Sequence, residues 1–335
     1  MIAVVLVGGF GTRLRPLTLH TPKQMLPVVD RPMIDWVVAA LSRHGVDHAV
    51  LALGYKPDAF QAAYPDGRCA GVQLHYAVEP EPMDTAGAIR FAALDAGVTG
   101  RFLVCNGDVL TDLDITALIA FHDRTGAEAT IALHQVDDPF RYGVVPTDDD
   151  GRVQAFVEKP PPGEAPTNLI NAGTYVLEPS VIERIAGGRR VSIERETFPS
   201  LVADRSLYAL DDGGAYWLDT GTPAAYLDAQ LDVLDGKRGE TPAGVAPTAD
   251  VHPDATVVRS VVRPGAVIGA GAVVRDAAVL DGARIDDGAT VVRAIVGPGA
   301  VVGRGATVTD LAVLGEGVVI EPGTTVRDVR IPEVV

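Results

Sequence analysis

Residues 2–13, IAVVLVGGFGTR, join an apolar run to a glycine-rich turn. The apolar run ends at Val7 and predicts a buried strand of a parallel sheet. Three of the next four residues are glycines, which let backbone N–H groups approach a polyphosphate closely. Arg13 closes the stretch and Lys23 follows ten residues later, so a folded-back loop can bring two cations to the same phosphates. The stretch therefore predicts a strand end that holds a nucleoside triphosphate.

Two better-known phosphate loops do not match this stretch. A dinucleotide fingerprint needs a third glycine where Leu14 stands, and a P-loop needs a closing Gly-Lys-Ser/Thr triplet, which does not follow. A structural turn with two surface cations is the competing interpretation. Three glycines beside two cations make it the less favoured one.

The first two thirds of the chain predict a doubly wound, Rossmann-like α/β sheet of mixed strand direction. Up to residue 130, strand-like and helix-like patterns alternate. The expected strands cover 2–7, 47–53, 72–78, 101–106, 128–136, 152–158, 170–177 and 206–219. The expected helices cover 33–44, 57–64, 85–94, 114–124, 179–186, 193–203 and 222–235. Ligands of such sheets bind at the carboxyl ends of the strands, where the glycine turn falls.

The last third has a different pattern, in which an aliphatic residue recurs every six positions. One phase comprises Val261, Val267, Val273, Val279, Ile285 and Val291, and a second comprises Val302, Val308, Leu314, Ile320 and Val326. A period of six predicts a left-handed parallel β-helix of hexapeptide repeats, in which stacked coils bury the aliphatic column. We therefore expect a catalytic domain over 1–235, a linker over 236–249 and a β-helix domain over 250–335.

Composition excludes several functions. The 335 residues carry a net charge of −16, a poor match for nucleic acid or an anionic membrane. Two cysteines form neither a disulfide framework nor a metal-ligand spacing. The sequence shows no signal-peptide pattern and no apolar run of the ~20 residues that a membrane span needs. We expect a cytoplasmic protein whose anionic substrates meet a local cluster of cations.

The glycine turn, followed by Pro22–Pro27, resembles the signature of the sugar-1-phosphate nucleotidylyltransferases, the NDP-sugar pyrophosphorylases. The resemblance extends to about residue 235, and hexapeptide repeats also occur in this family. It implies transfer of a nucleoside monophosphate from a nucleoside triphosphate to a sugar 1-phosphate, with release of pyrophosphate. It also implies Mg²⁺ as the cofactor and a homo-oligomer formed through the β-helix.

The resemblance also implies roles for individual residues. The catalytic residues would be Arg13, Lys23 and Asp108. The nucleotide would be bound by Gly8, Gly9, Gly11, Thr12, Arg13, Glu79, Thr85 and Gly87. The sugar phosphate would be bound by Gly143, Glu158, Lys159, Asn171 and Gly173. The metal would be held by Asp108 and Asp219.

Both metal candidates have a structural alternative. Asp108 follows an apolar strand, which favours a Mg²⁺ ligand, but Asn-Gly-Asp is also a common turn sequence. Asp219 would equally serve as the cap of a helix that begins near Thr222. Because Thr220 and Thr222 are competing caps, the metal role is the favoured one.

The family's base-reading loop matches residues 79–87 and places Glu79 at the edge of the base. A carboxylate only accepts hydrogen bonds. Guanine presents two adjacent donors, whereas thymine and uracil present one donor between two acceptors, so Glu79 favours guanine. Asp84 departs from the family, in which a glycine lets the backbone approach the base. Residues 192–199 resemble the mannose-1-phosphate guanylyltransferase branch, and we expect GTP and mannose 1-phosphate as the substrates.

Three alternatives remain. Residues 22–24 and 217–222 also resemble the thymidylyltransferase branch, which would use dTTP or UTP with glucose 1-phosphate. Many hexapeptide-repeat proteins are acyltransferases with a histidine base, but the repeats contain only His252, in the first coil. A regulatory subunit that binds a nucleotide sugar without turnover would be expected to have lost Arg13, Lys23 or a metal aspartate, and all are present.

Overall fold

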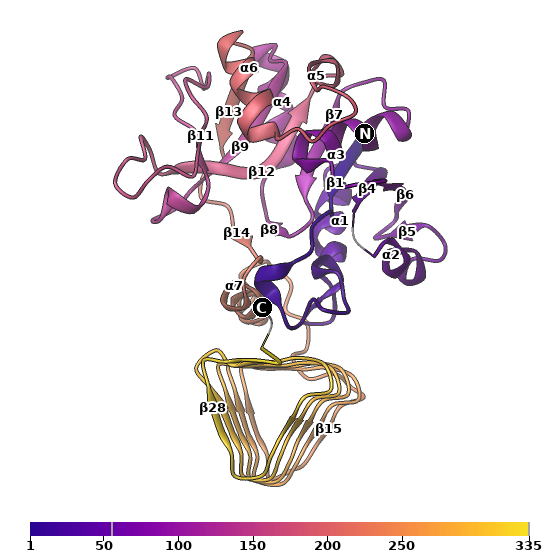
Figure 1. The fold of residues 1–335 in the computed structure, drawn as a ribbon, viewed down its shortest axis with the longest axis vertical. Coiled ribbons are helices and arrows are strands. Elements are labelled where there is room, and N and C mark those ends of the chain that lie inside the picture. The colour runs from indigo at the N-terminus through magenta and orange to yellow at the C-terminus, as the bar shows by residue number, and fades with distance from the viewer. Residues whose placement is uncertain (55, 334–335) are drawn as a thin grey trace. The chain divides into compact units, whose positions relative to one another are not determined.

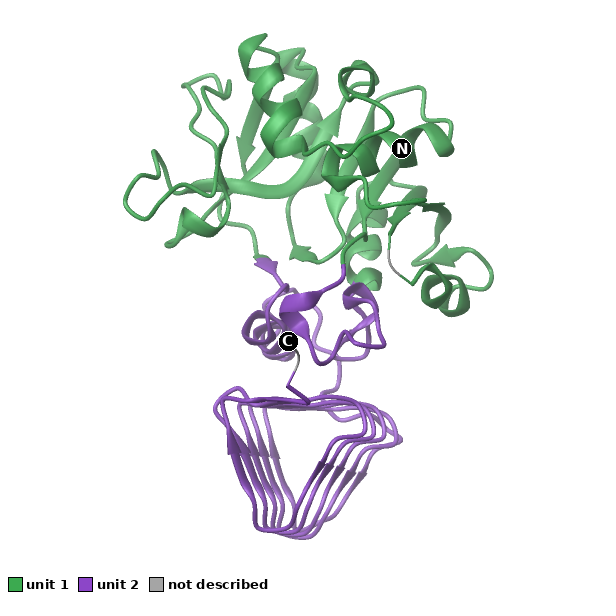
Figure 2. Cartoon of the chain, viewed as in Figure 1, with its two compact units in different colours: residues 1–9, 34–217 green, residues 10–33, 218–335 purple. Residues whose placement is uncertain are grey.

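A computed structural model describes residues 1–54 and 56–333 (Figure 1). The chain forms two compact units, one of residues 1–9 and 34–217 and one of residues 10–33 and 218–335 (Figure 2). Residues 334–335 of the expected β-helix domain lie outside the described residues. None of the helices that the structure describes is long and apolar enough to cross a membrane.

The first unit is built on a sheet of ten strands with the order β11-β10-β12-β7-β1-β4-β6-β5, to which β9 and β13 are added beside β12. Its central strands β7, β1, β4 and β6 are parallel, whereas β12 runs antiparallel to β7. The strands are β1 (Ile2–Leu6), β4 (His48–Leu53), β5 (Arg68–Cys69), β6 (Val72–Val78), β7 (Phe102–Asn106), β9 (Ala129–Gln135), β10 (Gly143–Val144), β11 (Val157–Glu158), β12 (Leu169–Leu177) and β13 (Leu207–Asp211). The predicted mixed, Rossmann-like sheet is confirmed.

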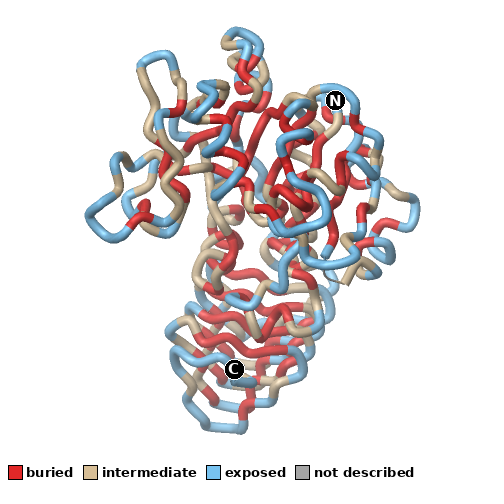
Figure 3. Tube along the Cα trace, turned by 45° about the horizontal axis from the view of Figure 1, so that its top comes forward, coloured by how far each residue is buried: buried red, intermediate tan, exposed pale blue. Residues whose placement is uncertain are grey.

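The helices lie close to their predicted ranges. They are α1 (Met33–Arg43), α2 (Pro57–Ala63), α3 (Asp84–Asp95), α4 (Ile115–Thr125), α5 (Ser180–Arg184), α6 (Phe198–Ala203) and α7 (Pro223–Leu234). Helix α3 packs on β1, β4 and β6 through small residues such as Ala86 and Ala92, which are fully buried. Figure 3 colours the buried stretches of the chain red. Small side chains let this helix approach the sheet closely, so its N-terminal end is fixed at the edge where the strands end.

Three predicted elements differ from the structure. The strand expected over 152–158 is reduced to β11. The strand expected over 206–219 is split into β13 and β14 (Trp217–Asp219), because Gly213 and Gly214 adopt positive φ values of 66° and 81° and turn the chain. The helix expected over 193–203 begins with a π-helical turn, Ile193–Thr197, before α6. Short pairs such as β2 (Pro27–Val28) with β3 (Arg31–Pro32), and the strand β8 (Val109–Thr111), were not predicted.

The second unit contains three parallel five-stranded sheets, the arrangement of a left-handed β-helix, which the period of six predicts. One sheet comprises β15 (Asp250–Val251), β18 (Val267–Ile268), β21 (Arg284–Ile285), β24 (Val301–Val302) and β27 (Val319–Ile320). The second comprises β16 (Thr256–Val258), β19 (Val273–Arg275), β22 (Thr290–Val292), β25 (Thr307–Thr309) and β28 (Thr325–Arg327). The third comprises β17 (Val261–Val262), β20 (Ala278–Val279), β23 (Ile295–Val296), β26 (Val313–Leu314) and β29 (Arg330–Ile331).

The buried column corrects the first predicted phase. Ile268 and Val274 point into the β-helix, whereas Val267 is 37% exposed and Val273 is only partly buried. The column then steps by five residues, from Val274 to Val279, and again from Val291 to Val296. The coils before Val302 therefore have two six-residue faces and one five-residue face, and counting by six shifts the register by one residue at each short face. The second phase is confirmed from Val302 to Ile320.

Candidate functional site

Two predicted nucleotide residues meet at the carboxyl end of β1. A β-carbon on Gly8 would lie 3.2 Å from Oε1 of Glu79, which follows β6. The Glu79 amide donates to the carbonyl of Leu53 at 2.8 Å, which extends the pairing of β6 with β4 beyond the last strand residue. The parallel register of three strands thus brings residues 71 positions apart into contact at one sheet edge.

The neighbouring strand places Asn106-Gly107-Asp108 at the same edge. Gly107 donates its N–H to the carbonyl of Leu6 at 2.9 Å, and a β-carbon there would lie 2.6 Å from Cγ1 of Val7. Only glycine allows this approach to β1. The turn that Gly107 shares with Asp108 consequently lies against the end of β1, and the role of Asp108 as a ligand stays a prediction.

The predicted sugar motif Asn171-Ala172-Gly173 forms a β-bulge in β12, at which the register with β9 shifts. The Asn171 carboxamide stabilises the bulge itself: its Oδ1 accepts from Gly173 N–H at 2.9 Å and its Nδ2 donates to the Tyr175 hydroxyl at 2.9 Å. Gly173 has a φ of +76° and lies against the Asn106 side chain. The bulge therefore joins the sugar motif to the turn that carries Asp108.

The remaining sugar-phosphate candidates come together at β10 and β11. Gly143 pairs with Glu158 across the two strands, and a β-carbon on Gly143 would lie 2.5 Å from the Phe156 ring and 3.1 Å from Oε2 of Glu158. The Lys159 ammonium lies 3.0 Å from Oε1 of Glu158 and is 60% exposed. An exposed pair of this kind contributes little to stability, so Lys159 can exchange its neighbour for a phosphate at small cost.

The base-reading candidate Glu79 is an oriented, half-buried carboxylate. Its Oε2 accepts from the Met83 N–H at 3.0 Å. Burial raises the pKa of the Glu79 carboxyl above its ordinary value of 4.5, and the Met83 hydrogen bond partly offsets this shift. Asp84, the departure from the family pattern, has a φ of +62°, so the chain keeps the conformation that a glycine would adopt there.

The structure gives two other predicted nucleotide residues partners within the protein. The Thr85 hydroxyl donates to Oε2 of Glu194 at 2.8 Å and accepts from the Ile193 N–H at 2.8 Å. Gly87 is buried, and a β-carbon there would lie 2.8 Å from Cβ of Met83 and 3.6 Å from the Arg189 carbonyl. Both residues therefore hold α3 against residues 189–194, and their contact with a nucleotide stays a prediction.

Gly9 belongs to the first unit with Gly8, whereas the glycine signature from Phe10 onward belongs to the second. Gly11 has a φ of +59°, and a β-carbon on it would lie 3.0 Å from Cγ2 of Thr18 and 3.3 Å from Cβ of Lys23. The Thr18 hydroxyl also donates to the Gly11 carbonyl at 2.8 Å. The segment thus folds back on itself and places Lys23 beside the glycine turn, while Thr12 begins a short 3₁₀ turn that also carries Arg13.

Arg13 and Asp219 lie on either side of Gly221 in this unit. A β-carbon on Gly221 would lie 2.7 Å from Nη2 of Arg13 and 2.9 Å from Oδ1 of Asp219, and the Gly221 N–H donates to that Oδ1. The cap of α7 is Thr222, whose hydroxyl accepts from the Ala225 N–H at 3.2 Å. Asp219 is therefore not the helix cap, which leaves the metal role as the better of its two interpretations.

Segment 10–33 is anchored at several points in its own unit. The Tyr226 hydroxyl and Nε2 of Gln230, both on α7, donate to the Pro27 carbonyl at 2.5 and 2.7 Å. From the β-helix, Nη1 of Arg263 donates to the Val29 carbonyl at 2.9 Å and Nη1 of Arg330 donates to the Arg13 carbonyl at 3.0 Å. The loop that carries the two cations is therefore fixed by structure that is remote in sequence.

A metal would need substrate oxygens as well as protein ligands. The described residues contain no group of three or more His, Cys, Asp or Glu side chains that would hold an ion alone. Asp108 and Asp219 supply the hard carboxylate oxygens that Mg²⁺ prefers, and Mg²⁺ commonly takes one or two carboxylates together with phosphate and water. Asp108 belongs to the first unit and Asp219 to the second, so each carboxylate is a candidate ligand on its own and their sharing of one metal stays a prediction. Nucleotidyltransferases of this kind generally use a divalent metal.

Sequence reasoning missed an aromatic cluster beside the sugar motif. The Trp217 indole donates to the Ala172 carbonyl at 2.9 Å and stacks on His134, with ring centroids 5.2 Å apart. Tyr142 meets the same indole edge-on at 5.5 Å. Tyr142 adjoins the predicted Gly143, and Trp217 stands two residues before the predicted Asp219; these positions were the only available signal. Gln24 was also missed: it is buried, and within the described residues neither polar atom of its amide has a hydrogen-bond partner.

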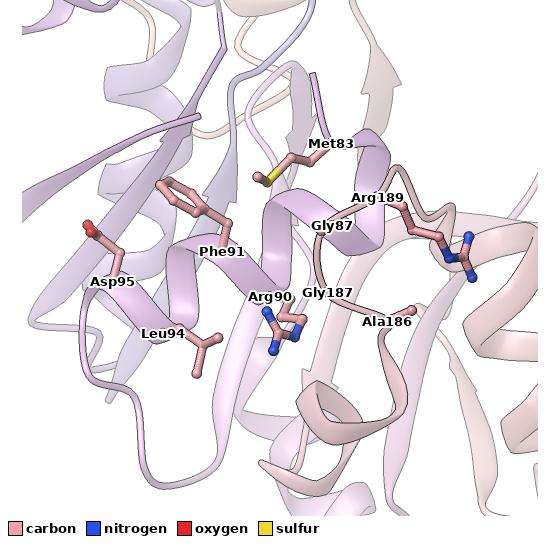
Figure 4. Close-up of a pocket in the computed structure, with 10 residues that line it drawn as sticks. Met83, Gly87, Arg90, Phe91, Leu94, Asp95, Ala186, Gly187 and Arg189 are labelled. Atoms are coloured by element: carbon pink, nitrogen blue, oxygen red, sulfur yellow. The ribbon is translucent and has the colours of Figure 1, made fainter. Parts of the chain in front are cut away.

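A pocket of about 310 Å³ lies along α3, on the side that faces the loop before Val191 (Figure 4). Met83, Phe91 and Leu94 give it apolar walls, and Arg90 and Arg189 place guanidinium groups at it. Arg189 forms an ion pair with Glu196 at 2.5 Å. This pocket shares Met83 and Gly87 with the base-reading segment but includes none of the predicted catalytic residues.

Comparison with known proteins shows which family the sequence matches. Residues 2–236 match the family model "Nucleotidyl transferase", and residues 240–333 match "GMPPB C-terminal domain". A mannose-1-phosphate guanylyltransferase of Mycobacterium tuberculosis is 42% identical over 303 residues, which cover 85% of this chain and 81% of that protein. A probable mannose-1-phosphate guanylyltransferase of Oryza sativa is 40% identical, with 82% and 74% covered.

Solved structures extend the similarity. HddC from Yersinia pseudotuberculosis superposes with a TM-score of 0.59 at 30% identity, covering 68% of this chain and 97% of that one. The same protein complexed with GMP-PN gives a TM-score of 0.58. Because the family model matches residues 2–236 and a relative is 42% identical over 85% of the chain, this chain belongs to the nucleotidyl transferase family.

Proposed function

We propose that this chain transfers GMP from GTP to mannose 1-phosphate, which releases pyrophosphate and forms GDP-mannose. The observation that carries the choice of base is the Glu79 carboxylate, half-buried beside Gly8 and held by the Met83 N–H. A carboxylate fixed there accepts two hydrogen bonds from N1–H and the 2-amino group of guanine and offers nothing to the acceptors of thymine or uracil. Relatives named mannose-1-phosphate guanylyltransferase support the sugar.

The proposed reaction is an in-line displacement at phosphorus. A phosphate oxygen of mannose 1-phosphate bonds to the α-phosphorus of GTP, and the bond from that phosphorus to the oxygen bridging the β-phosphate breaks. Because the nucleophile is already anionic, no general base is needed. The protein's task is to bring two anions together and to neutralise their repulsion.

Three cations divide this task in the proposal. Arg13 stabilises charge on the departing pyrophosphate, Lys23 binds near the α-phosphate, and Lys159 holds the sugar phosphate. Asp108 and Asp219 would hold Mg²⁺, which when bound neutralises charge on the reacting phosphates. Glycines 8, 9 and 11 with Thr12 would line the triphosphate, while Gly143, Glu158, Asn171 and Gly173 would line the sugar.

The organisation of the whole protein is part of the proposal. Residues 1–235 form the catalytic domain, 236–249 the linker and 250–335 the β-helix domain, a division that the ranges of the two family matches support. The β-helix mediates homo-oligomerisation, and the protein acts in the cytoplasm on small phosphorylated substrates.

Pyrophosphate release with Mg²⁺ tests the proposal. GTP, dTTP, UTP, ATP and CTP are each paired with mannose 1-phosphate and with glucose 1-phosphate. Turnover restricted to GTP with mannose 1-phosphate is the expected result. Preference for dTTP or UTP with glucose 1-phosphate would overturn the base assignment and keep the reaction. Absence of release with every pair would identify a regulatory subunit instead.

A further inference from the structure

Segment 191–194 lies against the start of α3 and makes hydrogen bonds with residues 83–87. Val191 N–H donates to the Met83 carbonyl at 3.0 Å, and the Val191 carbonyl accepts from the N–H groups of Ala86 and Gly87 at 2.9 and 3.2 Å. These bonds cross more than 100 residues of sequence. They attach the base-reading segment to an element that the proposed reaction does not otherwise use.

Side chains complete the attachment. Oε2 of Glu194 accepts from the hydroxyls of Thr85 at 2.8 Å and of Ser192 at 2.7 Å. The Thr85 hydroxyl accepts in turn from the Ile193 N–H. We call Thr85, Val191, Ser192, Ile193 and Glu194 the loop clamp. Ile193 is fully buried in the core of the unit, so the clamp is rooted in rigid structure.

One residue links the clamp to the base-reading carboxylate. Met83 receives the Val191 N–H at its carbonyl and donates its own N–H to Oε2 of Glu79. Between Glu79 and Met83 the chain is exposed at Glu81. Directly after Met83, Asp84 adopts a positive φ. A turn of this kind has little packing of its own, so the position of the Glu79 carboxylate depends on how firmly Met83 is held.

We propose that Glu194, acting through Thr85, is a positioning residue that fixes the base-reading turn and thereby sets the preference of the site for guanine over bases without a 2-amino group. A double hydrogen bond to guanine discriminates only if the acceptor stays within about 0.5 Å of its best position. Glu194 lies in the π-helical turn Ile193–Thr197, and turns of this kind are frequent at functional sites. The inference rests on the proposed function.

The test compares GTP with inosine triphosphate, which lacks the 2-amino group. Binding of each is measured by calorimetry in the absence of sugar phosphate, so turnover is not needed. We expect Glu194→Ala to reduce the GTP-to-inosine-triphosphate preference about tenfold, equivalent to about 1.4 kcal/mol. Glu194→Gln, which keeps the size of the side chain, is expected to show a smaller loss in the same direction.

A double-mutant cycle identifies the route. Thr85→Val removes the same hydroxyl contact, so the Glu194→Ala/Thr85→Val double variant is expected to lose no more preference than the larger single loss. Glu196→Ala is the matched control, because Glu196 stands two residues on in the same turn and pairs with Arg189 rather than with the clamp. It is expected to bind both nucleotides like the wild type.

Several outcomes would overturn the inference. Additive losses, or an unchanged preference in Glu194→Ala, would mean that Glu194 does not act through the turn. An unchanged preference with a raised KM for mannose 1-phosphate would make Glu194 a direct sugar contact. Hydrogen exchange tests the loop clamp independently of the proposed function. Faster amide exchange at residues 83–87 in Glu194→Ala would show that Glu194 holds the base-reading turn, even if the wild type prefers another nucleotide.

Discussion

The base-reading turn, residues 79–87, is held by a few hydrogen bonds, each with a different partner. The β-helix, residues 250–331, is held by one column of buried aliphatic side chains to which every coil contributes. In the β-helix, the buried side chains of neighbouring coils have equivalent environments, and stability is spread over many similar contacts. In the base-reading turn, a few hydrogen bonds carry the whole geometry. Substitutions in the β-helix should therefore chiefly change stability, and substitutions in the base-reading turn should chiefly change function.

The largest effect is expected at Asp108, the proposed metal ligand that follows β7. If its carboxylate holds the metal, Asp108→Asn removes a charge worth several kcal/mol in the transition state, and kcat should fall on the order of 10³-fold. Thermal melting should be nearly unchanged. The measurement is steady-state pyrophosphate release over a range of Mg²⁺. A variant with wild-type kcat would show that Asp108 is only a turn residue.

The next effect tests the repeat register. Ile285 is fully buried, so Ile285→Ala should reduce the free energy of unfolding by about 2–5 kcal/mol. Val267, which the period of six also predicts to be buried, is 37% exposed, and Val267→Ala should cost less than about 0.5 kcal/mol. Both are measured by chemical denaturation. Equal losses would restore the uncorrected register.

A smaller effect is expected at Asp84, whose φ of +62° disfavours a β-carbon. Asp84→Gly and Asp84→Ala both remove the carboxylate, so they differ chiefly in backbone strain. The glycine variant should be more stable than the alanine variant by about 1 kcal/mol. Thermal melting of the two variants side by side measures the difference. Identical melting would mean that the turn relaxes to a negative φ in the alanine variant.

The smallest effect concerns the protonation of Glu79, because its carboxyl is only half-buried. Its pKa is raised by burial, so the unfolded chain releases this proton at a lower pH than the folded protein does. Stability therefore falls as the pH rises from 4.5 through the folded pKa. Glu79→Gln should be slightly more stable than the wild type at neutral pH and equal to it below about pH 4.5. Denaturation at several pH values checks this, and a difference that persists in acid would contradict it.

These two regions also differ in what the sequence reveals. The strand–glycine stretch at residues 2–13 and the apolar strands around it follow local patterns, and the structure places them as expected. The column beyond Val302 was predicted for the same reason. The first phase was right at Val279, Ile285 and Val291 and off by one residue before them, because a count by six does not detect a five-residue face.

The candidate site was less predictable where it depends on distant pairs. Nothing local to Thr85 shows that its hydroxyl will meet Glu194, 109 residues away. The bulge at Gly173 and the approach of Gly107 to β1 likewise arise only when the strands are in register. The residue types suggested which side chains would bind substrate. Which of those side chains instead bond to one another became visible only with the strand pairing of the sheet.

The unequal lengths of the β-helix faces determine which insertions and duplications of residues this domain can accept. Val267 pairs with Arg284, and Arg284 with Val301, so one coil occupies 17 residues, whereas the next pairing, of Val301 with Val319, spans 18. The longer coil contains Asp310 and Leu311, both at positive φ, so the extra residue is absorbed at a corner. A duplication of one whole coil would leave every later side chain on its own face, and a one-residue insertion would be tolerated at that corner. The same insertion within a face would turn the remaining aliphatic residues toward water.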